Sequence, residues 1–162
     1  MKTLQWSSSH AVFVTEIDDE HKEIFQAVAD LQAGLHPPQA NLQELTGRLI
    51  ASVNGHFAHE ERLMRAARYE SLRWHKRLHE AARRRVVELV HQLEQGDPEA
   101  GRSLVAYLTD WLPSHTRIAD RMMAAALRNH RRGMYRMYLH ASTRPVDSCE
   151  WVDVNGRPFE PS

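Results

Sequence analysis

Two histidines, His75 and His79, stand four residues apart in a stretch with helical periodicity. Residues four apart on an α-helix lie on one face, one turn above the other, so both imidazoles can reach the same metal ion. Histidine is the commonest metal ligand in proteins, and the chain contains 11 of them. The pair alone is weak evidence, because two histidines at this spacing are more often unrelated. A metal site therefore needs ligands from other elements.

The other predicted helices also place ligand-type side chains on their apolar stripes. These side chains are His21, then His56 with Glu60, and then His115 with Asp120. A carboxylate on a core stripe is costly unless it is paired or binds a metal. Five imidazoles and two carboxylates are too many ligands for one iron or zinc ion, and they suit two metals bridged by both carboxylates. Mixed nitrogen and oxygen ligation of this kind favours a di-iron site.

The alternative interpretation is a set of buried histidines satisfied by hydrogen bonds. For any single position that alternative is the better one, because one histidine on an apolar face is usually a core residue. For all seven residues together the hydrogen-bond interpretation is the weaker one, because they fall in register on the apolar stripes of four predicted helices. The pattern as a whole therefore predicts a metal centre.

The spacing of apolar residues predicts four amphipathic helices joined by short loops. The first three span about residues 16–35, 41–67 and 71–95. The fourth begins at about residue 98 and ends between residues 129 and 133. Thr15 with Asp18 resembles a capping box at the start of the first helix. Four such helices can bury their apolar stripes together in an all-α, up-down-up-down four-helix bundle, which is the fold we predict. We assign this bundle to residues 1–132, with residues 1–14 as an arm packed across its outside.

Residues 133–162 form a short C-terminal extension of a different character. Residues 134–139 can add one or two helical turns, and an Asn-Gly turn within 152–159 can form a small hairpin, although a partly ordered tail fits equally well. From Arg121 to Val146 the chain has basic residues and no acidic ones. Residues 129–162 can therefore dock a protein partner, but a solvated tail is the default interpretation.

Composition favours no nucleic-acid or membrane partner. The 21 basic side chains balance the 21 acidic ones, so net charge implies neither nucleic acid nor an anionic membrane. The single cysteine, Cys149, cannot form an internal disulfide. The N-terminal residues lack the apolar run of a signal peptide, and no stretch is long and apolar enough to cross a bilayer. We therefore expect a cytoplasmic protein.

The ligand-type residues belong to four short motifs. These are Ile17-Asp-Asp-Glu-His21-Lys, His56-Phe-Ala-His-Glu60-Glu, His75-x-x-x-His79 and Trp111-Leu-x-x-His115-x-x-x-x-Asp120. Together they resemble the pattern of the hemerythrin family in its bacterial form. The resemblance covers about residues 6–128, and all seven ligand types recur in order at the family spacings.

The resemblance implies a pair of iron ions. His75, His79 and His115 would bind one iron. His21 and His56 would bind the other, and the two carboxylates would bridge the ions together with a solvent-derived oxo or hydroxo group. The second iron then has an open coordination position, which is where the family binds dioxygen.

One spacing strains this pattern. His115 and Asp120 are five residues apart, which is about 140° of rotation on a straight helix. Both can face inward only if the helix is kinked or locally widened, or if the side chains approach from opposite edges of the stripe. Pro113 removes a helical hydrogen bond here, and Thr116 stands where the family usually has isoleucine. These departures leave the ligands intact and bear on the shape of the oxygen pocket.

We expect a protein that binds dioxygen reversibly for storage, delivery or scavenging, and not an enzyme. A sensor of oxygen, redox state or iron is the first alternative, with residues 129–162 relaying the state of the site to a partner. Residues 1–162 include no methyl-accepting or nucleotide-cyclase sequence, so we prefer oxygen binding and storage over sensing. An enzyme acting on peroxide or nitric oxide ranks last, because the sequence offers no substrate pocket or dedicated proton donor for it. His59, off the ligand face, is predicted to lie on the surface.

Overall fold

A computed structural model describes residues 4–35, 42–97 and 99–142, without the side chains of residues 133 and 135–142. A short 3-10 helix, η1 (Ser8–His10), comes first. The larger elements are α1 (Thr15–Gly34), α2 (Leu42–Ala66), α3 (Leu72–Glu94), α4 (Ala100–His115), the π-helical turn η2 (Thr116–Asp120) and α5 (Arg121–Ser142). The last three follow one another without a gap, so they form one helical column.

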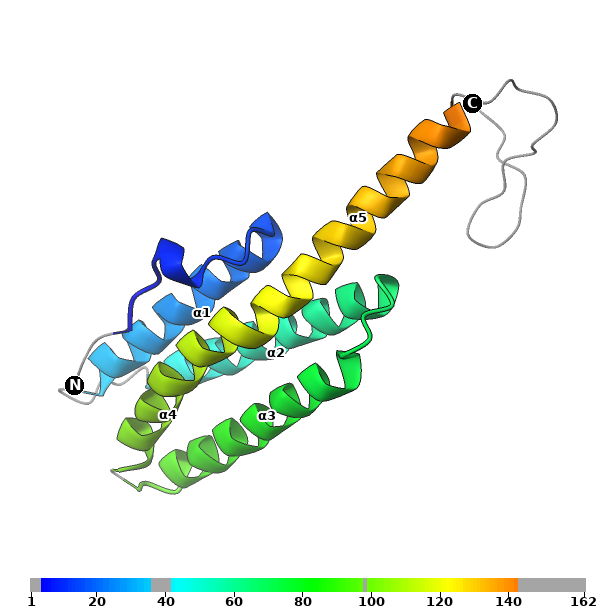
Figure 1. Ribbon diagram of the computed structural model, residues 1–162. Coiled ribbons are helices and arrows are strands. Elements are labelled where there is room, and N and C mark those ends of the chain that lie inside the picture. Colours follow the sequence, from blue (N-terminus) through cyan, green and yellow to red (C-terminus); the bar gives the residue numbers. More distant parts are fainter. Residues whose placement is uncertain (1–3, 36–41, 98, 143–162) are drawn as a thin grey trace, which may run out of the picture. The chain divides into compact units, whose positions relative to one another are not determined.

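α1, α2, α3 and the column that begins with α4 pack side by side as a bundle (Figure 1). α1 lies against α2 and α4, and α3 lies against the same two helices, so the columns close into a ring around one interior. The predicted all-α four-helix bundle is therefore confirmed. The first three helices also begin and end within one or two residues of their predicted limits.

The fourth column is longer than the sequence predicts. We expected it to end between 129 and 133, whereas α5 runs to Ser142. Gly133 costs a helix only about 1 kcal/mol, and the methionine, leucine, alanine and arginine residues around it favour helix. The chain separates into two compact units, and the boundary lies between Arg128 and Asn129. The hairpin expected within 152–159 lies outside the described residues, and the docking surface expected on 129–162 stays a prediction.

Two apolar clusters lie on either side of the ligand-bearing turns of the helices. The larger cluster takes side chains from all four columns: Ile24, Phe25, Val28 and Leu31 of α1, Leu45, Leu49, Val53 and Phe57 of α2, Ala82, Val86, Leu89 and Val90 of α3, and Leu104, Val105, Leu108 and Leu112 of α4, with Leu4 and Ala27. The smaller contains Val12, Ile17 and Ala124. In α1, His21 falls between Ile17 and Ile24, so the polar layer lies between two apolar layers.

The start of α1 differs from the predicted capping box. Thr15 is already helical, Val14 is the N-cap, and no side chain caps the helix. The Asp18 carboxylate instead accepts hydrogen bonds from the backbone N–H groups of Val12, at 2.8 Å, and Phe13, at 3.0 Å. These bonds hold Phe13 at a φ of 62°, in the left-handed region that non-glycine residues rarely adopt.

The N-terminal arm packs on the bundle, as its apolar residues predict. Val12 is fully buried in the smaller apolar cluster. The Arg121 guanidinium donates to the carbonyl oxygens of Ser9, at 2.7 Å, and Ala11, at 3.4 Å. Arg128 donates to the carbonyl oxygen of Val12. Two cations of α5 therefore hold the arm over the buried layer.

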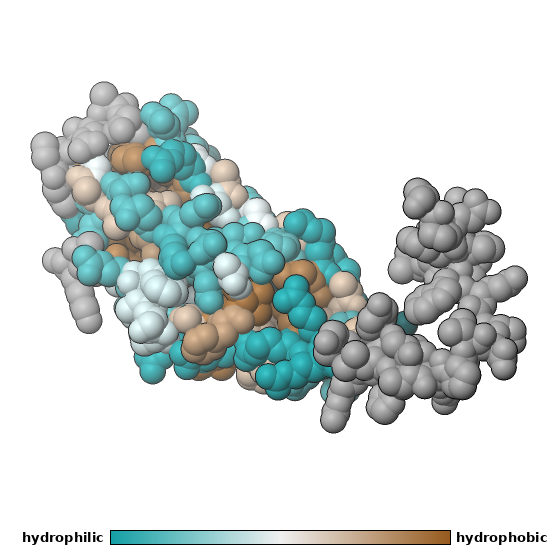
Figure 2. All heavy atoms as spheres, turned by 90° about the horizontal axis from the view of Figure 1, so that it is seen from above, coloured by the Kyte–Doolittle hydropathy of each residue, from teal (hydrophilic) through white to brown (hydrophobic). Residues whose placement is uncertain are grey.

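The face shown in Figure 2 carries many hydrophilic side chains, with apolar ones between them. In the described part of the chain, the exposed large apolar side chains are Phe13, Trp74, Val87, Ile118, Met122 and Met134. Among the described residues, no helix has both the length and the apolar character to span a membrane.

Replacing Asp18 with alanine should loosen the arm and destabilise the bundle. The change removes the acceptor of two backbone hydrogen bonds to a charged group, which contribute about 1.5–3 kcal/mol together with the backbone conformation they hold. Urea denaturation of Asp18→Ala followed by circular dichroism should show that loss. The matched control is Asp19→Ala, because the Asp19 side chain is 59% exposed and forms a surface ion pair with Lys22. The loss of unfolding free energy in this control should stay within about 0.5 kcal/mol. Equal losses in both variants would contradict this account.

Candidate metal centre

All seven predicted ligand residues meet in the interior of the bundle. They are His21 of α1, His56 and Glu60 of α2, His75 and His79 of α3, His115 at the end of α4 and Asp120 at the end of η2. None of them is more than 6% exposed. They form a three-histidine group and a two-histidine group that share both carboxylates, and within each set the ligand atoms lie within 4.8 Å of one another.

The two oxygens of Glu60 face different histidine groups. Oε2 lies 3.4 Å from Nε2 of His75 and 3.2 Å from Nε2 of His79. Oε1 lies 3.7 Å from Nε2 of His56, on the other side. A carboxylate that turns one oxygen to each group has the orientation of a bridging ligand.

Asp120 repeats this arrangement from the opposite column. Oδ1 lies 3.1 Å from Nε2 of His75 and 3.0 Å from Nε2 of His115. Oδ2 lies 3.2 Å from Nε2 of His21. Both carboxylates therefore span the same two histidine groups, one from α2 and one from η2.

A π-helical turn brings His115 and Asp120 to the same side. The turn covers Thr116–Asp120 and lies directly after His115. Its i→i+5 hydrogen bonding widens the turn, so residues five apart lie nearly above one another. This is the local widening that the five-residue spacing required. Pro113 lies just before the turn, and its carbonyl accepts a hydrogen bond from the Thr116 hydroxyl at 3.3 Å.

The buried polar atoms of this cluster lack ordinary hydrogen bonds. Both oxygens of Glu60 and Asp120 and both ring nitrogens of His21 and His75 have no partner of hydrogen-bond geometry in the described part of the chain, although some opposing atoms are as close as 3.0 Å. Each orphaned group would cost about 1–3 kcal/mol. Octahedral coordination with bonds of about 2.1 Å places neighbouring donors about 3.0 Å apart. The spacings and the donor types therefore fit metal ions.

Comparison with known proteins leads to the same kind of site. The family described as "Hemerythrin HHE cation binding domain" matches residues 12–127. The chain is 33% identical over 115 residues to Myohemerythrin-1 of Phascolopsis gouldii, covering 71% of this chain and 87% of that protein. It is 32% identical over 130 residues to Bacteriohemerythrin of Pseudomonas aeruginosa (strain LESB58), covering 80% and 84% respectively. The chain belongs to the hemerythrin family. The family implies a non-haem di-iron site, and the resemblance expected from the four motifs is confirmed.

Glu20 holds one histidine of this hemerythrin from outside the cluster. Nδ1 of His56 donates to Oε2 of Glu20 at 2.8 Å, and Nδ1 of His59 donates to Oε1 at 2.6 Å. The bond fixes the ring of His56 so that Nε2 points inward. His59, predicted to lie on the surface, has a side chain only 24% exposed and shares this carboxylate. Burial raises the pKa of Glu20, but these two histidines bring it below its ordinary value.

Glu61 occupies the corresponding place beside the three-histidine group. One of its oxygens lies 3.5 Å from Nδ1 of His79, and its side chain is only 8% exposed. Arg65 and Arg83 each donate to it at 3.3 Å. The charge of Glu61 is thus balanced by guanidinium groups, whereas Glu20 has imidazoles as its partners. The two histidine groups therefore have outer carboxylates in different electrostatic surroundings.

Aromatic rings cover the three-histidine group. Phe57 stacks on His79 with ring centroids 3.9 Å apart and an interplanar angle of 5°. Trp111 stacks on His115 with centroids 4.2 Å apart and an angle of 16°. Such packing fixes the imidazole planes and keeps water away from them.

The cluster sets the protonation of its own members. Burial raises the pKa of the Glu60 carboxyl, as does Asp120, but the nearby histidines lower it to about 2. Burial also raises the pKa of Asp120, and the charge of His115 brings it well below its ordinary value. For His75, burial lowers the pKa, whereas Asp120 and Glu60 raise it to about 9. Both carboxylates are therefore ionised at neutral pH, and His75 must release a proton when a metal binds.

Sequence reasoning found the inner residues and missed the outer ones. Glu20 and Glu61 are the chain neighbours of His21 and Glu60, so each is rotated about 100° from the inward stripe and looks like an exposed acid. One signal was present, because His56 and His59 are three apart and share a helix flank. That flank faces Glu20, a fact that only the packing of α1 against α2 supplies.

Replacing Glu20 with glutamine should weaken metal binding while keeping the side-chain size. The variant loses the charged acceptor that orients His56, and outer-shell changes of this kind cost about 10- to 100-fold in metal affinity. Competition of ferrous iron with a chelator under anaerobic conditions measures the change. The matched control is Glu23→Gln, an exposed position on the same helix. Unchanged affinity in Glu20→Gln would show that Glu20 does not orient a ligand.

Proposed function

We propose that this hemerythrin binds dioxygen reversibly at a di-iron centre, for storage, delivery or scavenging. One observation carries the proposal: Glu60 and Asp120 each turn one oxygen to the three-histidine group and the other to the two-histidine group. Two carboxylates placed in this way suit a pair of ions bridged by both. Membership of the hemerythrin family supports the choice of iron and of dioxygen.

The proposed ligand set divides unequally between the two ions. His75, His79 and His115 hold one iron, and His21 and His56 hold the other. With both carboxylates shared, the first group offers five protein ligands and the second offers four. The two-histidine group thus offers one protein ligand fewer, so dioxygen is expected on that side. A pair of irons held there would supply the redox chemistry of dioxygen binding.

The residues around the centre favour binding over turnover. All seven proposed ligands are buried, and Phe57 and Trp111 cover two of them, so water has little access. A dry apolar surrounding limits proton delivery and the loss of bound ligand by side reactions. Five neutral imidazoles also keep the negative charge around the ions lower than a carboxylate-rich set would. These features suit a protein that returns the gas unchanged.

The purified protein should contain two irons per chain and change its absorption spectrum reversibly with oxygen. The spectrum is recorded on anaerobically reduced protein, then in air, and then again under vacuum. A return to the first spectrum is the expected result, because the buried site supplies no external proton donor. Permanent oxidation would instead favour sensing or enzymatic turnover, and one zinc per chain would overturn the di-iron proposal.

Replacing His79 with alanine should remove iron and destabilise the bundle. The change removes one ligand and leaves buried carboxylates with fewer partners, which costs several kcal/mol. Iron content after gel filtration and the thermal unfolding midpoint measure the two effects. His91→Ala is the matched control, because His91 is an exposed histidine on the same helix. If His79→Ala kept both irons, the proposed ligand assignment would be wrong.

A further inference from the structure

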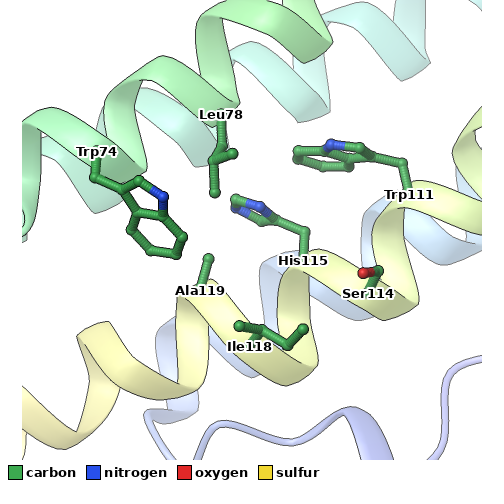
Figure 3. A pocket seen from close by; sticks show the side chains of 7 residues that line it. All are labelled: Trp74, Leu78, Trp111, Ser114, His115, Ile118 and Ala119. Atoms are coloured by element: carbon green, nitrogen blue, oxygen red, sulfur yellow. The ribbon is translucent and has the colours of Figure 1, made fainter.

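An apolar pocket opens beside the three-histidine group, between α3 and the column of α4 and η2 (Figure 3). Its volume is about 180 Å³, and its lining consists of Trp74, Leu78, Trp111, Ser114, His115, Ile118 and Ala119. In the close-up, Leu78 and His115 lie between the two tryptophan rings, with Ile118 and Ala119 at the level of the η2 helix. The pocket is therefore built by the turn that the metal ligands require.

The lining favours an apolar occupant over water. Side chains of tryptophan, leucine, isoleucine and alanine make up most of it, and Ser114 contributes the one hydroxyl. An ordered water needs about two to four polar partners, which this lining does not offer, so the pocket suits an apolar molecule better than a fixed water. Nε2 of His115 already faces Asp120 at 3.0 Å and Nε2 of His79 at 3.2 Å, so it is directed away from a new partner.

The mouth of the pocket is accessible from solvent. Trp74 is 36% exposed and Ile118 is 57% exposed, so two large apolar side chains stand at its rim. The floor is buried, since His115 is only 6% exposed and Ala119 is 1% exposed. A small molecule can therefore enter from the surface and reach the buried imidazole without unfolding of a helix.

The pocket lies on the three-histidine side of the cluster. Of the seven proposed ligands, His115 alone lines it, while His21 and His56 do not. An occupant would contact the His115 side chain and the Trp111 ring stacked on it. It would thus be separate from the position at which dioxygen is expected to bind a metal.

We propose that this pocket is a second binding site, for small uncharged apolar molecules between a gas atom and a single aromatic ring in size. Two tryptophan faces, Leu78 and Ile118 provide the contacts, and exclusion of water from the apolar lining provides the driving force. The occupant would be held by contacts with these side chains, so it needs no bond to a metal. A failure of this second site and a failure of the proposed oxygen binding would therefore be seen in different measurements.

Xenon and benzene are the probes for this site in the full-length purified protein. Crystals pressurised with xenon should show an anomalous peak between Trp74 and Trp111, and calorimetric titration with benzene should give a Kd on the order of 1 mM or tighter. Xenon alone would support the site and restrict it to gas-sized molecules, whereas binding of both would extend it to a single ring. Binding of neither would overturn the proposal.

Variants of the lining separate this pocket from other apolar surface. Leu78→Trp should weaken benzene binding at least about tenfold, because the larger ring occupies part of the space. The matched control is Val87→Trp on the same helix, since Val87 is 59% exposed and lies outside the lining; its Kd should change less than about twofold. Trp74→Ala is a second variant at an exposed position, which removes one wall and should weaken benzene similarly. Unchanged affinity in both pocket variants would overturn the proposal.

Discussion

The structure depends on the pairing of two buried carboxylates with five buried imidazoles. Glu60 and Asp120 are both fully buried, and such charges are sustained only when opposite charge or metal surrounds them. Each is ringed by histidine nitrogens on two sides. Removing one member leaves the others uncompensated, so the cluster acts as a unit. Its members come from α1, α2, α3, α4 and η2, so these elements must keep their positions relative to one another.

The rest of the bundle serves to keep that polar layer in place and dry. A large apolar cluster packs on one side, and a smaller one, closed by Val12 of the arm, packs on the other. Arg121 and Arg128 hold the arm, and Asp18 fixes its turn into α1. These contacts are ordinary hydrogen bonds and apolar packing. They offset the free-energy cost of burying the ligand-type side chains, which would be unfavourable on its own.

The two halves of the centre differ in more than their histidine count. Beside the three-histidine group stand Glu61 with its arginines, the stacked rings of Phe57 and Trp111, and the apolar pocket at His115. Beside the two-histidine group stands Glu20, which is shared with His59. The same fold thus gives each group its own orientation, charge and access to solvent. That asymmetry gives the two histidine groups different surroundings within one bundle.

The sequence by itself determined the helices, the apolar stripes and the seven ligand-type residues, because helical periodicity and residue spacing are local properties of the chain. It also required a distortion between His115 and Asp120 without specifying it, and the π-turn is what the fold selected. The partners Glu20 and His59 and the pocket beside His115 were decided by tertiary structure alone, because they depend on distances between residues of different helices, which sequence spacing does not encode. The continuation of α5 to Ser142 is instead consistent with the helix propensity of its own residues.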